Sequence, residues 1–211
     1  MARPAFIALD GLDGAGKSTQ CRLLGDWLRT RGFDVVQCAD PGGTEIGDVL
    51  RKLLLEHRGH MTLPCEAMLF MASRAQLVAE IIRPALDAGK AIVCDRFLLA
   101  NVVYQGHAGG LDAQTLWDIG LLATSGLEPD LTFVLDLPID IAQSRRKVEA
   151  DRMERRDGGY FAKVREGFLA EARRRPERIR VIDATLATDA IQSIMRTALA
   201  GLCERETASK R

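Results

Sequence analysis

The sequence predicts an α/β domain of three layers, in which helices cover both faces of a parallel sheet. Two observations lead to this prediction. Short apolar runs rich in β-prone residues alternate with longer amphipathic segments along almost the whole chain. The glycine-rich segment GLDGAGKST, residues 11–19, directly follows the first apolar run and precedes the first amphipathic segment. The length of 211 residues suits one domain with a substantial core.

Five strands are expected, near residues 5–9, 34–38, 91–95, 131–136 and 179–182. The first is short and apolar throughout, which is typical of a buried strand in a parallel sheet. Helical segments separate the strands, and a last helix is expected near residues 187–202. We therefore expect one domain over residues 1–203 and a flexible polar tail at residues 204–211.

Charge and cysteine pattern argue against several classes of protein. The chain has 29 basic and 29 acidic residues, and this net charge of zero argues against general binding to nucleic acids or anionic membranes. We expect no signal segment and no membrane span, because no apolar stretch is long enough. The five cysteines include no C-x-x-C pair and form no metal-binding pattern with the three histidines. A cytoplasmic protein with reduced thiols and no structural zinc is therefore expected.

Residues 11–19 match the pattern G-x-x-x-x-G-K-S/T at every fixed position and indicate a phosphate-binding loop. The glycines allow successive backbone N–H groups to surround phosphate oxygens. Lys17 can reach the β- and γ-phosphates, and the Ser18 hydroxyl can bind Mg²⁺. A turn without a ligand is the alternative, which the order of strand, loop and helix disfavours. The predicted nucleotide-binding residues are Gly11, Asp13, Gly14, Ala15, Gly16, Lys17, Ser18 and Thr19.

The segment Asp40-Pro41-Gly42-Gly43-Thr44 follows the second predicted strand. By composition alone it is most often a simple turn. Because we expect this strand to lie next to the phosphate-binding loop, the turn and its Pro41 could help to shape a substrate pocket.

A long helix is expected over residues 66–86, with Phe70 and Arg74 four positions apart on one face. Leu77 and Ile81 continue this face, so Arg74 interrupts a surface that otherwise looks buried. Arg74 could extend to the helix edge or pair with an acidic residue. Alternatively, Phe70 could stack on a planar base while Arg74 donates hydrogen bonds to its edge.

The third predicted strand ends in the pair Asp95-Arg96. A carboxylate at this strand end is suited to holding hydrated Mg²⁺ opposite Ser18. Arg96 could bind a phosphoryl group in a bidentate manner. An internal ion pair is the alternative, which the nearby phosphate-binding loop disfavours.

Polar side chains also follow in the segment after the third strand, where Asn101, Tyr104 and Gln105 lead into a glycine-rich stretch. An asparagine amide can read donor and acceptor positions on a base, and a tyrosine can fill space against a sugar. These residues are therefore candidates for binding a nucleotide.

Residues 145–158 are strongly charged, and the pair Gly158-Gly159 stands at their end. Mixed charges on a helix usually mark a solvated face. Beside a phosphate site, the same composition is typical of a mobile lid whose arginines close onto the phosphates and exclude water. The candidate lid arginines are Arg145, Arg146 and Arg152.

Together these motifs resemble those of the thymidylate kinases, the nucleoside monophosphate kinases that phosphorylate dTMP. The resemblance extends from Phe6 to about Leu202, and it is specific because the motifs occur as an ordered set. The motifs are GLDGAGKST at 11–19, DPGGT at 40–44, LF at 69–70, SRAQ at 73–76, DRF at 95–97, YQG at 104–106, PDL at 129–131, DRME at 151–154 and VREGF at 164–168.

The resemblance implies a P-loop nucleoside monophosphate kinase fold, a homodimer, and ATP and Mg²⁺ as cofactors. It implies transfer of the ATP γ-phosphoryl group to dTMP, which gives dTDP for dTTP biosynthesis. In similar enzymes the residue that matches Phe70 stacks on thymine, the residue that matches Arg74 contacts its edge, and the residue that matches Asn101 lies beside it.

Three further roles come from the same resemblance. Arg96 matches the arginine that binds the acceptor phosphate. Asp10 matches an acidic residue near the acceptor sugar and metal. Tyr104 matches an aromatic residue that disfavours a ribose 2′-hydroxyl. The implied catalytic residues are Lys17, Arg96, Asp95, Arg152, Arg145 and Arg146. The implied substrate-binding residues are Asp10, Pro41, Phe70, Arg74, Arg96, Asn101, Tyr104 and Gln105, and the implied metal-binding residues are Ser18, Asp95 and Asp10.

The sequence departs from the family pattern at several positions. Gly14 stands where some members, notably eukaryotic ones, carry a loop arginine, so the catalytic arginine is expected in the lid, as in similar bacterial enzymes. Ala39-Asp40 stands where Arg-Glu is common, Ala100 where serine is common, and Gly109 where arginine is frequent. The loss of a positive group at Ala39 affects how the acceptor phosphate can be bound.

The expected reaction is in-line phosphoryl transfer, in which the protein supplies position and charge rather than a covalent intermediate. The acceptor phosphate is already an anion, so no strong general base is required. Two alternatives are a related kinase with another nucleotide or nucleoside acceptor, and a nucleotide-binding regulator with little turnover. Intact Lys17, Ser18, Asp95 and Arg96 argue against the regulator.

Overall fold

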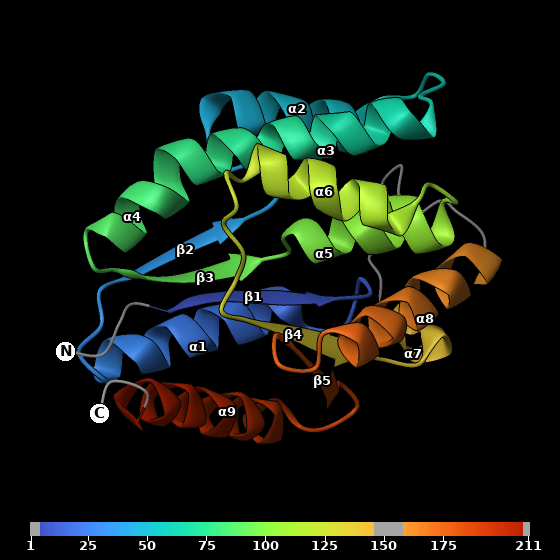
Figure 1. Cartoon of the computed structure of the whole chain (residues 1–211). Coiled ribbons are helices and arrows are strands. Elements are labelled where there is room, and N and C mark those ends of the chain that lie inside the picture. The colour runs from blue at the N-terminus through green and yellow to red at the C-terminus, as the bar shows by residue number, and fades with distance from the viewer. Residues whose placement is uncertain (1–4, 146–157, 209–211) are drawn as a thin grey trace.

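A sheet of five parallel strands forms the centre of the molecule (Figure 1). The computed structural model describes residues 5–145 and 158–208. The strand order is β2-β3-β1-β4-β5, and the strands are β1 (Phe6–Gly11), β2 (Val35–Ala39), β3 (Ala91–Asp95), β4 (Leu131–Asp136) and β5 (Ile179–Asp183). The predicted strands and their parallel arrangement are confirmed.

The central strands are buried because helices cover both faces of the sheet. Figure 1 shows α1 (Lys17–Thr30) and α9 (Thr188–Ala208) on one side, and α2 (Glu45–Glu56), α3 (Leu63–Leu77) and α6 (Ala113–Ala123) on the other. All six residues of β1 are buried. The ring of Phe6 packs edge-on against Phe97, with 5.0 Å between ring centroids. The predicted three-layer architecture is therefore confirmed.

The sheet order brings two predicted site segments together. Strand β1 pairs with β3 and places Leu9 opposite Asp95, so the phosphate-binding loop after β1 and the Asp95-Arg96 pair lie at the same edge. Strand β2 pairs with β3 rather than β1. The expectation that β2 neighbours the phosphate-binding loop is therefore wrong, because β3 crosses over to the position between them.

The long helix expected over residues 66–86 begins earlier and is not regular. Helix α3 begins at Leu63, after Thr62, whose hydroxyl accepts a hydrogen bond from the Cys65 N–H at 3.4 Å. A π-helical segment, η1 (Val78–Ile82), and a short helix, α4 (Arg83–Asp87), continue the same helical path. The sequence pattern missed the π turns because an apolar face alone does not distinguish them from α turns.

A second π-helical segment lies beside the site. Helix α5 (Leu98–Asn101) passes into η2 (Val102–Ala108), which carries Tyr104 and Gln105. Helix α8 (Gly158–Arg174) packs on η2 and donates a hydrogen bond from the Tyr160 hydroxyl to the Tyr104 carbonyl at 2.6 Å. These contacts hold η2 against the rest of the domain.

The last element of the described residues is α9, which extends to Ala208. Residues 204–208, the first part of the expected flexible tail, are therefore helical. The remaining tail residues and most of the expected lid, residues 146–157, lie outside the described residues. Among the residues described, no helix is long and apolar enough to cross a membrane.

Candidate active site

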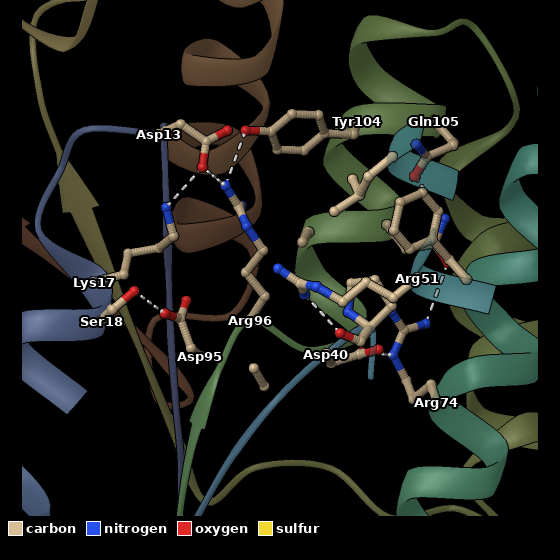
Figure 2. Close-up of a pocket in the computed structure, with 16 residues that line it drawn as sticks. Asp13, Lys17, Ser18, Asp40, Arg51, Arg74, Asp95, Arg96, Tyr104 and Gln105 are labelled. Carbon is tan, nitrogen blue, oxygen red and sulfur yellow. Dashed lines mark hydrogen bonds and ion pairs between the residues drawn. The ribbon is translucent and has the colours of Figure 1, made fainter. Parts of the chain in front are cut away.

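A pocket opens at the carboxyl ends of β1, β2 and β3 (Figure 2). One end is lined by the phosphate-binding loop and the other by α3, α5 and η2. Of the predicted residues, those that line it are Asp13, Lys17, Ser18, Pro41, Phe70, Arg74, Asp95, Arg96, Asn101, Tyr104 and Gln105. The fold thus brings together in one cavity residues that are distant in the sequence.

The phosphate-binding loop takes the backbone shape that its glycines allow. Gly14 has φ 85° and Gly16 has φ 89°, both in the left-handed region that favours glycine. Gly16 directly precedes α1, and Thr19 lies in the first turn of that helix. The buried Ala15 bonds its N–H to the Leu12 carbonyl at 3.2 Å. The loop therefore encloses the amino end of α1, where an anion is favoured.

Lys17 is buried beneath this loop and is held by two acceptors. Its Nζ donates to the Leu12 carbonyl at 2.9 Å and to Asp13 Oδ1 at 3.3 Å. Burial, together with the charge of nearby Arg96, lowers the pKa of Lys17. A bound phosphate would supply the negative charge that this buried ammonium group favours.

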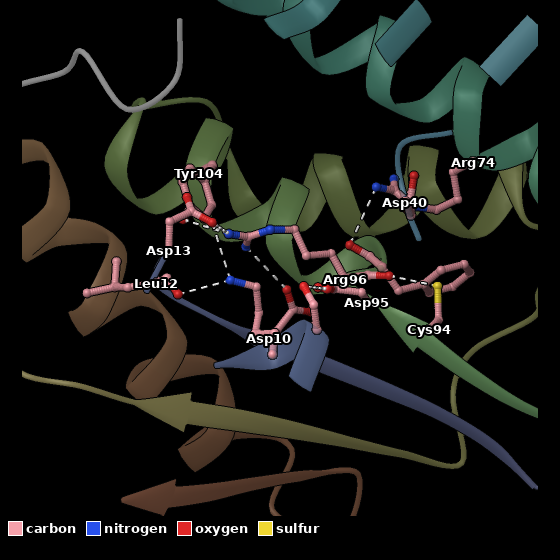
Figure 3. A network of polar contacts seen from close by, with 12 residues as sticks. Asp10, Leu12, Asp13, Asp40, Arg74, Cys94, Asp95, Arg96 and Tyr104 are labelled. Atoms are coloured by element: carbon pink, nitrogen blue, oxygen red, sulfur yellow. Dashed lines mark hydrogen bonds and ion pairs between the residues drawn. The ribbon is translucent and has the colours of Figure 1, made fainter. Parts of the chain in front are cut away.

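Arg96 has the most unusual backbone of the site, with φ 69°. Its N–H donates to the Leu9 carbonyl at 2.8 Å, and its carbonyl accepts from Cys94 Sγ at 3.0 Å. A left-handed conformation costs a non-glycine residue about 1–2 kcal/mol. Such strain is typical of functional positions, and here it turns the side chain away from β3 toward the phosphate-binding loop (Figure 3).

The Arg96 guanidinium lies among acidic groups of the first strand and loop. Its Nη2 donates to Asp13 Oδ1 at 2.7 Å, its Nη1 lies 3.7 Å from Asp10 Oδ1, and the group stacks 5.2 Å from the Tyr104 ring centroid. Although burial opposes the change, the charges of Arg96 and Lys17 lower the pKa of Asp13. Asp13 therefore holds both cations of the phosphate end.

Oxygen atoms suited to Mg²⁺ converge beside these cations. The Ser18 hydroxyl donates to Asp95 Oδ2 at 2.5 Å, which joins α1 to the end of β3. Asp10 is completely buried, and within the described part of the chain neither of its carboxylate oxygens has a hydrogen-bond partner. No cluster of three His, Cys, Asp or Glu side chains suited to a metal occurs in residues 5–145 and 158–208. Ser18 and Asp95 nevertheless fit Mg²⁺, which takes few protein ligands beside phosphates and water.

Asp10 does not line the pocket, in contrast to Asp13. It lies behind the Arg96 side chain, at the end of the buried strand β1 (Figure 3). The place near an acceptor sugar that the resemblance implied for Asp10 stays a prediction, and Asp13, which lines the pocket, is a second candidate for it.

The other end of the pocket contains a buried ion pair. Arg74 Nε donates to Asp40 Oδ2 at 2.6 Å, and both side chains are almost completely buried. Arg74 also lines the pocket together with Phe70. The pairing of Arg74 with an acidic residue is therefore confirmed, and its contact with a base stays a prediction that its place in the pocket allows.

Arg51 is a pocket residue that the sequence reasoning missed. It lies on α2, and its Nη1 donates to the Pro41 carbonyl at 2.7 Å while the side chain lines the cavity beside Ala39. The available signal was the spacing on α2, because Arg51 lies four residues after buried Gly47 and three before buried Leu54.

The candidate lid arginines are only partly described. Arg145 is exposed at the end of α7 (Ile139–Ser144), and its Cβ would lie 3.2 Å from a Cβ built on Gly14. It is therefore next to the phosphate-binding loop. Arg146 and Arg152 lie outside the described residues.

Comparison with known proteins agrees with this geometry. The family model described as thymidylate kinase matches residues 9–194. The chain belongs to the thymidylate kinase family. It is 50% identical to the thymidylate kinase of Rhodopirellula baltica over 180 residues, which cover 85% of this chain and 74% of the relative. It is 45% identical to that of Symbiobacterium thermophilum over 194 residues, which cover 90% of both chains.

A solved thymidylate kinase structure has the same fold. The crystal structure of the thymidylate kinase from Ehrlichia chaffeensis superposes with a TM-score of 0.77 at 29% identity, covering 93% of this chain and 98% of that chain. As a member of the thymidylate kinase family, the protein is a phosphotransferase of the P-loop class.

Proposed function

We propose that the protein transfers the γ-phosphoryl group of ATP to dTMP and so forms dTDP, a precursor of dTTP. The observation that carries this proposal is one continuous pocket, with a phosphate-binding loop at one end and the Phe70 and Arg74 side chains at the other. A polyphosphate donor and an aromatic acceptor base can therefore occupy the two ends of the same cavity.

The donor phosphates bind at the loop and Lys17. Ser18 and Asp95 would hold Mg²⁺, which would neutralise charge on the phosphates, and the buried Asp10 would add negative charge when it is ionised. Arg96 lies between the two ends and positions the acceptor phosphate. Asp13 keeps Lys17 and Arg96 in place before the phosphates arrive, so little rearrangement is needed at the reaction. A lid arginine, of which Arg145 is the described candidate, adds charge from the outside.

The acceptor base lies between Phe70 and the buried polar side chains. Phe70 stacks on thymine, Arg74 and Asn101 contact its edge, and Tyr104 fills the space where a ribose 2′-hydroxyl would lie. Pro41 and Gln105 complete the wall of this part of the pocket. Arg51 supplies a positive group beside Ala39, where the common arginine is missing.

Production of ADP from ATP and Mg²⁺ tests the proposal, with dTMP, dUMP, dCMP, dGMP, AMP and thymidine offered separately. We expect a clear preference for dTMP and at least a hundredfold loss in Lys17→Ala, because the β- and γ-phosphates lose their buried cation. Preference for another acceptor would keep phosphoryl transfer and overturn the substrate. Binding of ATP without turnover of any acceptor would contradict a kinase and favour a regulator.

We also propose that the protein is a homodimer that joins through α2, α3 and α6. These helices lie side by side on one outer side of the molecule (Figure 1). They expose large apolar side chains, which are Ile46, Val49 and Leu53 on α2, Met68 on α3 and Leu122 on α6. A second copy would remove this apolar surface from water.

A cytoplasmic location completes the proposal. Of the cysteines in the described part of the chain, Cys21, Cys38, Cys65 and Cys94 are free thiols. Free thiols are typical of proteins in reducing compartments.

A further inference from the structure

We infer that Glu66 is a specificity-determining positioning residue, which fixes the orientation of the Gln105 and Asn101 side-chain amides behind the base site. The inference rests on the proposed function, because it concerns how the acceptor base is selected. Glu66 lies on α3 and is 1% exposed, and it is not among the described residues that line the pocket. Its influence on a ligand must therefore pass through other side chains.

A continuous chain of buried hydrogen bonds connects Glu66 to the base end of the pocket. Gln105 Nε2 donates to Glu66 Oε1 at 2.8 Å, and Asn101 Nδ2 donates to Gln105 Oε1 at 2.7 Å. Arg74 Nη1 then donates to Asn101 Oδ1 at 3.2 Å, and Arg74 Nε donates to Asp40 Oδ2 at 2.6 Å. All five side chains are buried.

The Glu66 carboxylate and the Arg74 guanidinium, at the two ends of this row of hydrogen bonds, determine which side-chain groups donate and which accept. A carboxylate accepts hydrogen bonds and a guanidinium only donates them, whereas an amide can do either, depending on its orientation. Glu66 therefore requires the NH₂ group of Gln105, which directs the Gln105 oxygen toward Asn101. Arg74 requires the oxygen of Asn101, so both ends favour the same orientation of the two amides.

The orientation of the two amides determines which hydrogen-bond donors and acceptors face a base in the pocket. Arg74 retains one Nη2 N–H donor beyond its printed hydrogen bonds, and the Asn101 oxygen beside it retains a second lone pair as an acceptor. Thymine offers the complementary pair, the O4 acceptor and the N3–H donor. Cytosine offers the reverse, an N4 amino donor and an unprotonated N3. A fixed Asn101 orientation therefore favours thymine over cytosine.

Glu66 opposes the reversed arrangement specifically. If both amides turned over, the Gln105 oxygen would face the Glu66 carboxylate, and the Asn101 NH₂ group would face Arg74. Two hydrogen-bond acceptors would then face each other at Glu66, and two donors would face each other at Arg74. Both arrangements are strongly unfavourable in a buried environment. Glu66 thus excludes an orientation that would accept the wrong base.

The test compares Glu66→Leu with Glu66→Gln by kcat/KM for dTMP and for dCMP, with KM for ATP and the thermal midpoint as further readouts. We expect Glu66→Leu to lower the dTMP-to-dCMP ratio about tenfold, the worth of one buried hydrogen bond, with KM for ATP nearly unchanged. Glu66→Gln retains an acceptor oxygen for Gln105 and should keep most of the ratio. Glu80→Leu, which removes an exposed carboxylate from η1, is the matched control and should leave the ratio unchanged.

An unchanged ratio in Glu66→Leu would overturn the inference, as would a loss in Glu66→Gln equal to that in Glu66→Leu. If Glu66→Leu does not fold, Glu66→Ala serves instead, because alanine favours the helix and also lacks an acceptor. A wild-type protein that phosphorylates no nucleotide would refute the proposed function. An active wild-type protein with an unchanged ratio in the variant would refute only the role of Glu66.

Discussion

At the scale of single residues, Asp10 shows how burial alters the chemistry of a carboxyl group. It lies one residue before the end of the buried strand β1, and burial raises its pKa from 3.8 to about 7, although Arg96 and Lys17 act in the opposite direction. The group is therefore largely protonated below neutral pH in the free protein. In the unfolded chain the same group ionises near its ordinary pKa, so the folded state binds a proton more tightly.

The substitution Asp10→Asn should stabilise the protein more as the pH rises. Below about pH 4 Asp10 is neutral in both states, and the substitution should have little effect. Between about pH 4 and pH 7 the unfolded wild-type chain releases its proton first, so the advantage of Asp10→Asn should grow by about 1.4 kcal/mol per pH unit and then level off. Urea denaturation from pH 4 to pH 8 without Mg²⁺ measures this difference. A difference that does not vary with pH would contradict the assigned burial.

The residue scale also shows how much of the site the sequence predicted. Lys17, Ser18, Phe70, Arg74, Asp95 and Arg96 could be named because short motifs carry them, and the fold places them in one pocket. Arg51 was missed although its spacing on α2 was a signal. Glu66 could not be named, because its contact with Gln105 joins helical segments that are distant in the sequence. Asp13 was predicted as a loop residue, but its pairing with both Lys17 and Arg96 depends on how the loop meets β3.

At the scale of elements, the alternation of strands and helices was predicted with little error because apolar periodicity reports burial directly. The place of β2 at the edge of the sheet and the π segments η1 and η2 were not predicted. The edge position of β2 depends on the path of the crossover connections, and the π segments depend on a change in the spacing of backbone hydrogen bonds. Neither leaves a distinct pattern in the sequence.

The contact between the phosphate-binding loop and α7 leads to a test of packing. A Cβ at Gly14 would lie 2.8 Å from the Ala142 carbonyl oxygen of α7, and Gly14 has φ +85°. Gly32 has the same φ of +85°, but a Cβ there meets nothing within 4 Å. We expect Gly32→Ala to lower the free energy of unfolding by about 1–2 kcal/mol through backbone strain alone, and Gly14→Ala to lower it further through the added clash.

Urea denaturation of the two variants under the same conditions measures this contrast. Equal losses would show that α7 moves away from the loop without cost. A longer side chain at Gly14 would meet the same atoms of α7, which agrees with the prediction that the catalytic arginine comes from outside the loop.

At the scale of the whole molecule, the exposed apolar face of α2, α3 and α6 predicts how copies associate. Val49 is 66% exposed and lies in this face, so Val49→Glu should place a charge where a partner would exclude water. We expect size-exclusion chromatography with light scattering to give a dimer for the wild type and a monomer near 23.2 kDa for Val49→Glu. Ile194→Glu is the matched control, because Ile194 is 43% exposed but lies on α9, on the other side of the sheet (Figure 1). A monomeric wild type, or equal effects of the two variants, would contradict the proposed interface.

The left-handed backbone of Arg96 has a consequence for how this enzyme can evolve. A glycine would take the same φ of 69° without steric penalty, so selection for folding alone would favour replacing the arginine. Such a replacement would remove the guanidinium that lies between the two ends of the pocket. At position 96, the residue that would give the more stable fold differs from the residue that phosphoryl transfer needs. Only selection for function can therefore keep the arginine.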